Sequence, residues 1–296
     1  MSVIKKCFVS RFGSKGRIVE ADYSQIEVVV QAFLSGDEQM QQDIRSGIDF
    51  HCKRLAYKLK EDYDEVYTKC HDETHPEHSK YKKLRKDIKV FSFRKAYGAG
   101  APSIAEVLGC SIDEAKEFFA IEDALYPKVK ELQDRWIAEV QQSKQPSTMR
   151  TSKGLPACIG HIKSITGKRY VFQEDDAPSF LRRQGQMTSF KPTKIKNYPV
   201  QGLAGEILYA SLGLLVRKLL NDEKLSDKCL LINTVHDSII FDIHTDVLPD
   251  ALPLIKKLML SVPKRLEELF DFTFDLPLSV DLEMGLNWAD MDKVQV

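Results

Sequence analysis

The stretch Arg17-Ile-Val-Glu-Ala-Asp22-Tyr-Ser-Gln-Ile-Glu27 decides the fold, because an apolar run ends there in a carboxylate and a helix signal follows at once. The apolar side chains before Asp22 predict a short buried strand. Ser24 and Glu27 have the spacing of a capping box, which predicts a helix to about Leu34. Asp22 is therefore expected in the corner between strand and helix. There its carboxylate either helps to cap the helix or faces a ligand.

The composition describes a globular chain without excess charge. Its 296 residues are 43% hydrophobic, which is enough for one or two domains with a substantial core. Basic and acidic residues number 43 each, so nucleic-acid binding cannot be inferred from net charge and needs local basic clusters. The six cysteines lie 18 or more residues apart, which favours reduced thiols over a disulfide framework. The sequence shows neither a membrane-span pattern nor a signal-peptide pattern, so we expect a soluble cytoplasmic protein.

The spacing of apolar residues and breakers predicts the other elements. The β-branched run 28–30 favours a strand, but the helical spacing around it and Gly36 as a stop favour a helix. The remaining predictions are a mainly helical segment 38–57, a helical pair 104–142 broken near 126–127, a hairpin 154–172, a helix 204–220, a hairpin 229–243, a helix 252–269 and a strand 276–283.

Residues 58–79 form a polar, charge-rich insertion that carries candidate metal ligands. Thiolate and imidazole groups suit zinc. The candidates in the insertion, with two nearby, are Cys70, His71, His75, His78, His51 and Cys52. Their spacing matches no closed zinc site, so a solvated loop is the alternative.

Residues 80–98 carry a basic and aromatic stripe. Arg85, Lys89, Phe93 and Tyr97 recur every four residues, so on an α-helix they form one face about 18 Å long. Two cations followed by two rings suit a nucleoside triphosphate, with the phosphates on the cations. The alternative is an amphipathic helix with core rings. Eight basic residues against one acidic residue in this stretch favour the binding of a polyanion.

Two polar residues, Asn197 and Gln201, precede the predicted helix 204–220. They either hydrogen-bond to bases or template backbone, or they cap this helix. The sequence pattern alone leaves both possibilities open.

The predicted hairpin 229–243 has His236 and Asp237 at its tip. An aspartate at a hairpin tip is most often a turn former. Asp22 and Asp237 on neighbouring strands are instead the two carboxylates that a pair of Mg²⁺ ions needs for phosphoryl transfer. Mg²⁺-dependent chemistry is therefore a hypothesis that these two residues carry together.

In combination these stretches resemble the motifs of the family A DNA polymerases, the class of bacterial DNA polymerase I and related phage replicases. Residues 22–27 are similar to motif A, residues 85–98 match the motif B pattern RxxxKxxxFxxxYG, and His236-Asp237 matches motif C. Further matches at 34–38, 126–129, 197–202 and 285–288 extend the resemblance over almost the whole chain. It implies an α+β right-hand polymerase fold, with an antiparallel palm sheet, a mainly helical fingers subdomain and no thumb.

The resemblance implies template-directed DNA synthesis by two-metal transfer of dNTPs to a primer 3′-hydroxyl. Asp22, Asp237 and the backbone carbonyl of Tyr23 would hold two Mg²⁺ ions. Glu27 would crowd a ribose 2′-hydroxyl and so favour deoxynucleotides. Nucleotide contacts are implied for Arg85, Lys89, Phe93, Tyr97, Glu27 and Gln25. Contacts with primer–template DNA are implied for Asn197, Gln201 and His236.

The implied subdomains are palm 1–37, fingers 38–190 with the motif B helix 80–98 and the insertion 58–79, and palm 191–296 with the hairpin 229–243. A palm without its first strands leaves an unpaired sheet edge. We therefore expect a split polymerase of phage type, acting in the host cytoplasm. A separate N-terminal polypeptide would supply the thumb and the rest of the palm.

The sequence departs from the family pattern at two places. Val28-Val29 stands where motif A usually continues Leu-Arg, and Ser238 stands where motif C usually has a third carboxylate. His-Asp-Ser also occurs in single-subunit phage-type RNA polymerases, which makes such an enzyme the alternative. Glu27 and Phe93 favour DNA synthesis. A second alternative is an inactive remnant that only binds nucleic acid.

Overall fold

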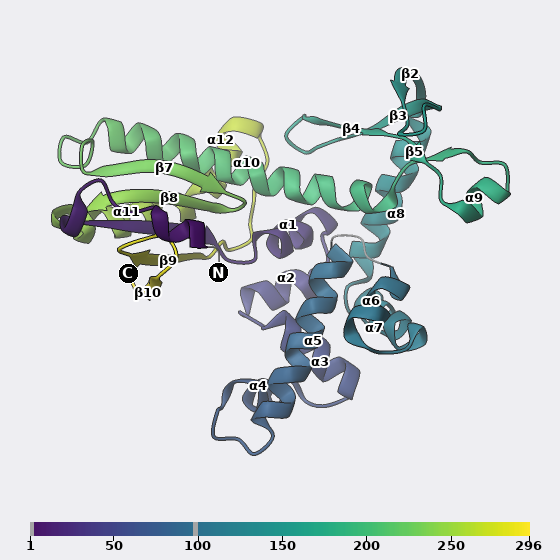
Figure 1. Cartoon of the computed structure of the whole chain (residues 1–296), viewed down its shortest axis with the longest axis horizontal. Helices are drawn as coiled ribbons and strands as arrows, with labels where there is room; N and C mark the ends of the chain where they lie inside the picture. The colour runs from purple at the N-terminus through teal and green to yellow at the C-terminus, as the bar shows by residue number, and fades with distance from the viewer. Residues whose placement is uncertain (1–2, 97–99) are drawn as a thin grey trace. The chain divides into compact units, whose positions relative to one another are not determined.

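The computed structural model describes residues 3–96 and 100–296, apart from the side chains of 93–96 and 122 (Figure 1). The chain divides into two compact units. We call residues 1–30 with 201–296 the sheet unit, and residues 31–200 the helical unit. Each unit is described by itself below.

The division between the units falls inside two continuous helices, α1 (Ile26–Ser35) and α10 (Pro192–Leu220). The subdomain boundaries after residues 37 and 190, which the resemblance implies, stay a prediction. Helix α1 also settles the ambiguity at residues 28–30 in favour of a helix.

The sheet unit is built on a five-stranded sheet in which each pairing is antiparallel, as expected. The strand order is β10-β9-β1-β8-β7. The strands are β1 (Gly16–Tyr23), β7 (Cys229–Val235), β8 (Ser238–His244), β9 (Val280–Gly285) and β10 (Met291–Val294). The predicted hairpin at 229–243 is therefore confirmed. Strand β9 starts four residues later than predicted, because buried Leu276 packs from a loop instead of a strand.

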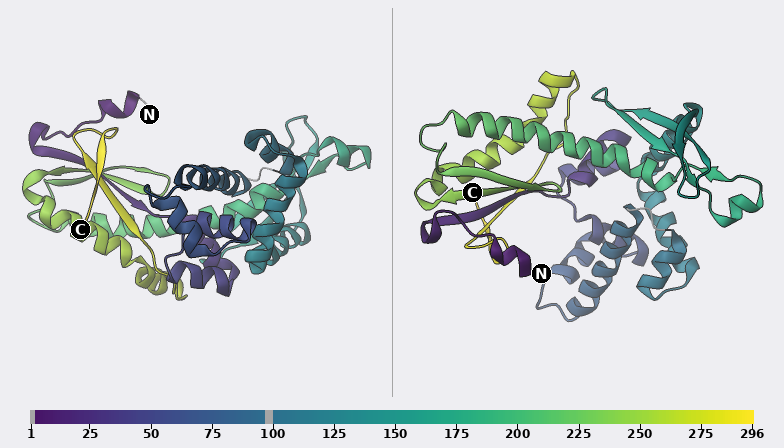
Figure 2. Two further views of the ribbon diagram at one scale, coloured as in Figure 1. Left: turned by 90° about the horizontal axis from the view of Figure 1, so that it is seen from below. Right: turned by 45° about the horizontal axis from the view of Figure 1, so that its top comes forward.

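The two faces of β1 have different environments because side chains alternate across a strand. Val19, Ala21 and Tyr23 are at most 1% exposed. Tyr23 reaches Ser211 on α10 and the carbonyl of Met259 on α11 (Leu248–Leu260), so these helices cover this face, as Figure 2 shows. Asp22 points to the other face, where it is only half-buried.

The predicted helix 252–269 is two helices, α11 and α12 (Val262–Phe270). Pro263 lies in the first turn of α12, where its missing N–H costs nothing. A proline in the interior of one long helix would have removed a hydrogen bond, so the chain starts a new helix instead.

The helical unit is a packed array of helices with a small sheet region. Its helices are α2 (Glu38–Arg45), α3 (Phe50–Leu59), α4 (Tyr63–His71), α5 (His78–Ala96), α6 (Ala101–Leu108), α7 (Ile112–Leu125), α8 (Pro127–Gln142) and α9 (Ser179–Arg183). Its strands are β2 (Gln145–Arg150), β3 (Pro156–Lys163), β4 (Arg169–Gln173), β5 (Asp175–Asp176) and β6 (Thr188–Ser189). The break near 126–127 and the hairpin β3–β4 are as predicted, while the segment 104–125 holds two helices instead of one.

The polar insertion at 58–79 is not simply a solvated loop, because it contains α4. Asp62 caps this helix by accepting hydrogen bonds from the backbone N–H groups of Asp64 and Glu65. Val66 and Cys70, one turn apart, are at most 5% exposed and belong to the core of the unit. Tertiary burial of these two side chains outweighs the polar composition of the segment.

Helix α10 begins at Pro192 and passes through Pro199, whereas the sequence predicted a start near 204. Ile195, Val200 and Ile207 are at most 7% exposed, and their burial offsets the hydrogen bond that Pro199 removes. Asn197 and Gln201 therefore lie inside the helix and do not cap it, which removes one of the two alternatives for them. Within the described ranges, none of the helices combines the length and apolarity needed to cross a membrane.

Candidate active site

Asp22 lies near the end of β1, on the central strand of the sheet. Its Cα partners are Ser238 on β8 and Asp281 on β9. Directly opposed residues in antiparallel strands share one face of the sheet. A carboxylate, a hydroxyl and a second carboxylate therefore stand side by side across three strands.

Asp237 reaches the same place from the tip of the β7–β8 hairpin. The turn consists of His236 and Asp237, and His236 has a positive φ of 56°, which is uncommon for a residue other than glycine. The backbone N–H of Tyr23 donates to the carbonyl of Asp237 at 3.3 Å, which ties the turn to the end of β1. The predictions that Asp237 lies at a hairpin tip and that this hairpin neighbours the strand of Asp22 are confirmed.

The carboxyl of Asp22 has a pKa of about 7, well above its ordinary value of 3.8. Burial is the largest cause, followed by the charge of Asp237. Smaller contributions come from Glu20, from a hydrogen bond with Asp237 and from Asp281. Burial and like charges both penalise the ionised form. Carboxylate oxygens forced together in this way fit a hard divalent cation such as Mg²⁺.

This raised pKa predicts that Asp22→Asn stabilises the metal-free protein. Ionising Asp22 costs folding free energy as the pH rises from about 4 through 7, because the folded pKa exceeds the unfolded one. We expect the substitution to raise the free energy of unfolding by about 1–2 kcal/mol at about pH 8, after allowing for solvent screening, and by much less at about pH 4. Urea unfolding in EDTA at both pH values measures this. Asp292→Asn, at an exposed position on β10, is the control. An equal increase in its free energy of unfolding at about pH 8 would show that the stabilisation does not come from the raised pKa of Asp22.

Tyr23 anchors the corner that holds Asp22. Its hydroxyl lies 2.6 Å from Ser211 Oγ and donates to the carbonyl of Met259 at 2.7 Å. Its side chain is 1% exposed, and burial raises the pKa of its hydroxyl. The ring thus joins the end of β1 to both covering helices.

Tyr23→Phe is expected to lower the free energy of unfolding by about 1–3 kcal/mol, because it leaves buried polar groups without this hydroxyl. Chemical denaturation followed by circular dichroism measures the change. Tyr209→Phe, whose side chain is 69% exposed, is the matched control. If Tyr23→Phe lowers the free energy of unfolding no more than Tyr209→Phe does, the hydrogen bonds of the Tyr23 hydroxyl do not stabilise the fold.

Glu27 lies in the first turn of α1, where it is half-buried and close to Asp237. Burial raises its pKa, and so does the charge of Asp237. A hydrogen bond with Gln201 and the nearby His236 act in the opposite direction. The structure therefore brings Glu27, Gln201 and His236 together, next to Asp237.

The capping-box prediction is wrong. Helix α1 starts at Ile26, so Ser24 precedes its N-cap position, and the Ser24 hydroxyl donates to Asp281 Oδ2 at 2.8 Å. Gln25 is exposed and has a positive φ of 56°. Backbone strain at Gln25 and His236, on both sides of the carboxylate pair, is typical of a functional site.

Asp281 is a residue that the sequence reasoning missed. It flanks Asp22, accepts the hydrogen bond from Ser24 and lies 3.7 Å from Lys293. The alternation of apolar and acidic residues over 280–283 was the available signal, because it places both acids of that strand on one face. Ser238, which replaces the expected third carboxylate, is buried and donates to the carbonyl of Val235.

The basic stripe lies in the helical unit, on α5. Arg85 donates to Asp49 Oδ2 through Nε at 3.0 Å and through Nη2 at 2.5 Å, and Lys89 is exposed one turn later. The side chain of Phe93 and the whole of Tyr97 lie outside the described residues. Asn197, also in the helical unit, is half-buried on α10.

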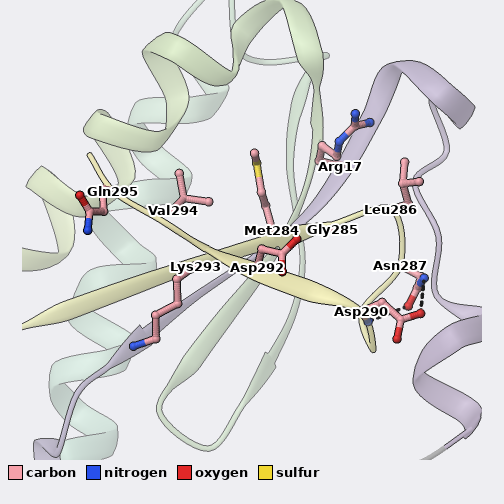
Figure 3. Close-up of a pocket in the computed structure, with 10 residues that line it drawn as sticks. All are labelled: Arg17, Met284, Gly285, Leu286, Asn287, Asp290, Asp292, Lys293, Val294 and Gln295. Atoms are coloured by element: carbon pink, nitrogen blue, oxygen red, sulfur yellow. Dashed lines mark hydrogen bonds between the residues drawn. The ribbon is translucent and has the colours of Figure 1, made fainter. Parts of the chain in front are cut away.

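A hollow of about 580 Å³ in the sheet unit is not part of this site (Figure 3). It is lined by Arg17 and by residues of β9, β10 and the turn between them, including Gly285, Asn287 and Lys293. Arg17 is held by the carbonyls of Ser14 and Gly16. Among the side chains that the structure describes, none of the predicted site residues lines the hollow.

A family model described as DNA polymerase family A matches residues 1–290. The DNA polymerase I of Chloroflexus aurantiacus is 27% identical over 288 residues, which cover 97% of this chain and 25% of that protein. The DNA polymerase I of Geobacillus stearothermophilus is 28% identical over 274 residues, with 92% and 26% covered. The chain thus spans about a quarter of the length of these relatives.

A solved structure shows the same fold. The POL domain of Pol1 from M. smegmatis, in complex with DNA primer-template and dNTP, matches with a TM-score of 0.67 at 20% identity. The match covers 96% of this chain and 42% of that one. At this identity the similarity establishes the mixed α and β architecture and no more.

Proposed function

Because the chain belongs to the family A DNA polymerases, we propose that it carries out template-directed DNA synthesis as the catalytic part of such an enzyme. The reaction transfers a deoxynucleotide from a dNTP to a primer 3′-hydroxyl. The Asp22–Asp237 pair carries the proposal. An acidic side chain near the end of β1 and one from the tip of the adjacent hairpin meet there, and that of Asp22 has a pKa of about 7. Their mutual repulsion favours the binding of cations between them.

Asp22, Asp237 and the backbone carbonyl of Tyr23 are the proposed metal ligands. Two Mg²⁺ ions, when bound there, supply the positive charge that acidifies the 3′-hydroxyl and neutralises the triphosphate. The ring of Tyr23, locked between two helices, keeps its own carbonyl and the neighbouring Asp22 in place. Fixed ligands hold the reacting groups in an orientation that favours in-line transfer.

Arg85 and Lys89 are the proposed ligands of the triphosphate. They lie one turn apart on α5, and a guanidinium with an ammonium suits adjacent phosphate groups. Arg85 is held by Asp49, so the triphosphate has to replace this carboxylate as its partner. Phe93 and Tyr97 continue the stripe in sequence and are proposed to contact the sugar and base.

Glu27 is proposed to select the sugar and Gln25 to contact the nucleotide. Glu27 is half-buried and hydrogen-bonded to Gln201, so it is held near Asp237 instead of swinging freely. Asn197, Gln201 and His236 are proposed to contact the primer–template. The positive φ of His236 turns the hairpin tip and presents its exposed imidazole.

Two alternative functions are less well supported. Ser238, which stands where family A polymerases usually have a carboxylate, favours a phage-type RNA polymerase. Such an enzyme does not account for the Glu27 carboxylate, which is hydrogen-bonded to Gln201. An inactive remnant that only binds nucleic acid does not account for the pairing of Asp22 with Asp237. A metal-dependent DNA polymerase accounts for both.

We further propose that the chain works with a separate N-terminal polypeptide that supplies a thumb and the rest of the palm, as in a split polymerase of phage type. Exposed apolar side chains support a missing partner surface, since Val3, Ile4 and Val9 are 79%, 69% and 62% exposed. In this proposal residues 1–37 and 191–296 form the palm, and residues 38–190 form the fingers.

Primer extension tests these proposals. The chain is given a primer–template, Mg²⁺ and either dNTPs or rNTPs, with and without the candidate partner polypeptide. We expect incorporation of dNTPs that EDTA abolishes and that the partner increases. Salt-sensitive DNA binding without incorporation under any condition would favour the remnant, and equal use of rNTPs would favour the RNA polymerase.

A further inference from the structure

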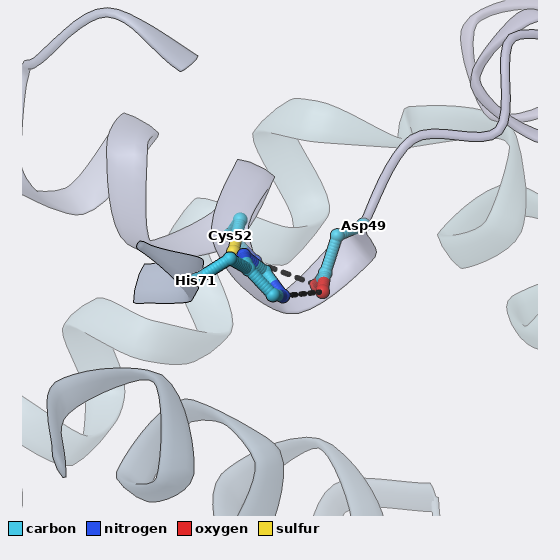
Figure 4. Close-up of side chains that lie close together, drawn as sticks. All are labelled: Asp49, Cys52 and His71. Atoms are coloured by element: carbon cyan, nitrogen blue, oxygen red, sulfur yellow. Dashed lines mark hydrogen bonds and ion pairs between the residues drawn. The ribbon is translucent and has the colours of Figure 1, made fainter. Parts of the chain in front are cut away.

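Three side chains of different chemistry converge in the helical unit, apart from the proposed magnesium site. Asp49 is the N-cap of α3, Cys52 lies in the first turn of the same helix, and His71 ends α4. Their ligand atoms, one per residue, all lie within 4.8 Å of one another (Figure 4). Rotamer adjustments of about 1 Å would bring these atoms to the spacing of a tetrahedral zinc site, which uses bonds of about 2.0–2.3 Å.

His71 is oriented as a metal ligand. Its Nδ1 donates to the carbonyl of Tyr67 at 2.9 Å, so in the neutral ring the lone pair is on Nε2. Nε2 points to Asp49 Oδ2 at 3.6 Å, and the ring is stacked on Tyr67 with centroids 4.2 Å apart. A hydrogen bond from the other ring nitrogen to a backbone carbonyl is the arrangement that metal-binding histidines almost always show.

Asp49 supplies the oxygen ligand. Its Oδ1 accepts from the backbone N–H groups of His51 and Cys52, and its Oδ2 accepts from Arg85 through both Nε and Nη2. These four hydrogen bonds use the four lone-pair sites of a carboxylate, so a cation on Oδ2 has to take the place of one of the two bonds from Arg85. Although burial opposes ionisation, the hydrogen bond from Arg85 lowers the pKa of Asp49, which keeps the carboxylate charged.

Cys52 supplies the soft ligand. Its side chain is fully buried, and burial followed by the charge of Asp49 raises its pKa above the usual range. The sulfur binds zinc as the thiolate, so the proton of the thiol leaves when the metal binds. Cys70, whose thiol is hydrogen-bonded to that of Cys52, lies beside the cluster.

We propose that Asp49, Cys52 and His71 bind one Zn²⁺ ion that joins the start of α3 to the end of α4. Mixed sulfur, nitrogen and oxygen ligands suit zinc, whereas magnesium prefers oxygen alone. One thiolate and one carboxylate neutralise the ion. The site accounts for two of the candidate ligands in the sequence, Cys52 and His71, and adds Asp49. His75 is not part of it, because its Nδ1 accepts from the backbone of Glu77.

Metal counting on the purified chain tests the proposal without reference to polymerase activity. The protein is freed of metal with EDTA, loaded with zinc, passed through a desalting column and analysed for zinc per chain. Asp22→Asn is included as the background, so that zinc at the proposed magnesium site is not counted. We expect one zinc per chain in this background and a higher thermal unfolding midpoint when zinc is bound.

Variants at the ligands decide the outcome. His71→Gln and Cys52→Ser are each expected to weaken zinc binding by at least about tenfold. Cys110→Ser and His75→Gln are the matched controls and are expected to keep the metal. With cobalt in place of zinc, a thiolate-to-metal absorption band is expected and is lost in Cys52→Ser.

His71 keeps the test decisive if Cys52→Ser fails to fold, because the His71 side chain is 39% exposed and its replacement leaves the core intact. No retained zinc in the Asp22→Asn background, or equal retention in His71→Gln and His75→Gln, would overturn the proposal.

Discussion

Asp22→Asn and Asp237→Asn are each expected to slow nucleotide incorporation by at least about 10³-fold, which is about 4 kcal/mol of transition-state stabilisation. Both carboxylates are proposed to hold the same pair of ions, and the amide cannot replace the lost negative charge. The fold should survive, since Asp22 is only half-buried and its ionisation costs stability. Single-turnover incorporation with saturating DNA and dNTP measures the rate.

Asp292→Asn is the matched control for these variants, because it removes a carboxylate from the same sheet at an exposed position on the edge strand. Its rate should equal that of the unmodified chain. The double variant Asp22→Asn/Asp237→Asn is expected to be little slower than either single variant, because residues that act as a unit are not additive. If the fold-reduction in rate of the double variant equals the product of the two single fold-reductions, the two aspartates act independently.

Glu27→Ala is expected to reduce discrimination against ribonucleotides by about 10²-fold. The carboxylate is held by Gln201 next to Asp237, where a 2′-hydroxyl of an incoming ribonucleotide would crowd it. Removing it opens the space that the hydroxyl needs, so incorporation of rNTPs rises while incorporation of dNTPs changes little. The ratio of kcat/KM for a dNTP to that for its rNTP measures the effect.

Glu38→Ala is the control for Glu27→Ala, because Glu38 also lies in the first turn of a helix but pairs with Lys128 in the helical unit. Glu27→Gln should lose less discrimination than Glu27→Ala, since the amide fills nearly the same space. If Glu27→Ala and Glu38→Ala have the same ratio of kcat/KM for a dNTP to that for its rNTP, Glu27 does not select the sugar. It is then a structural residue at the start of α1.

The sequence was sufficient to predict the strands that position Asp22 and Asp237. The apolar run before Asp22 and the apolar runs on both sides of Asp237 gave strands β1, β7 and β8, because a buried strand leaves a clear pattern. Their pairing places the two carboxylates together. The family was inferred from the resemblance of these and the intervening residues to polymerase motifs. The match of the family model to residues 1–290 confirms it.

The errors have physical causes. The capping box at Ser24 and Glu27 was a local pattern, whereas a partner 257 residues away, Asp281, takes the hydroxyl of Ser24. Helix α4 was hidden in a polar insertion, because only Val66 and Cys70 show its buried side. The start of α10 was misplaced because burial of neighbouring side chains overrides the proline within it. Each error involves a contact between residues distant in the sequence, which local patterns do not record.

The most direct test of the central claim is Mg²⁺-dependent single-turnover incorporation of one dNTP by the unmodified chain, Asp22→Asn and Asp292→Asn, each with primer–template and the candidate partner polypeptide. We expect incorporation by the unmodified chain and by Asp292→Asn, and a rate at least about 10³-fold lower for Asp22→Asn. Incorporation by Asp22→Asn at the rate of Asp292→Asn would contradict the claim.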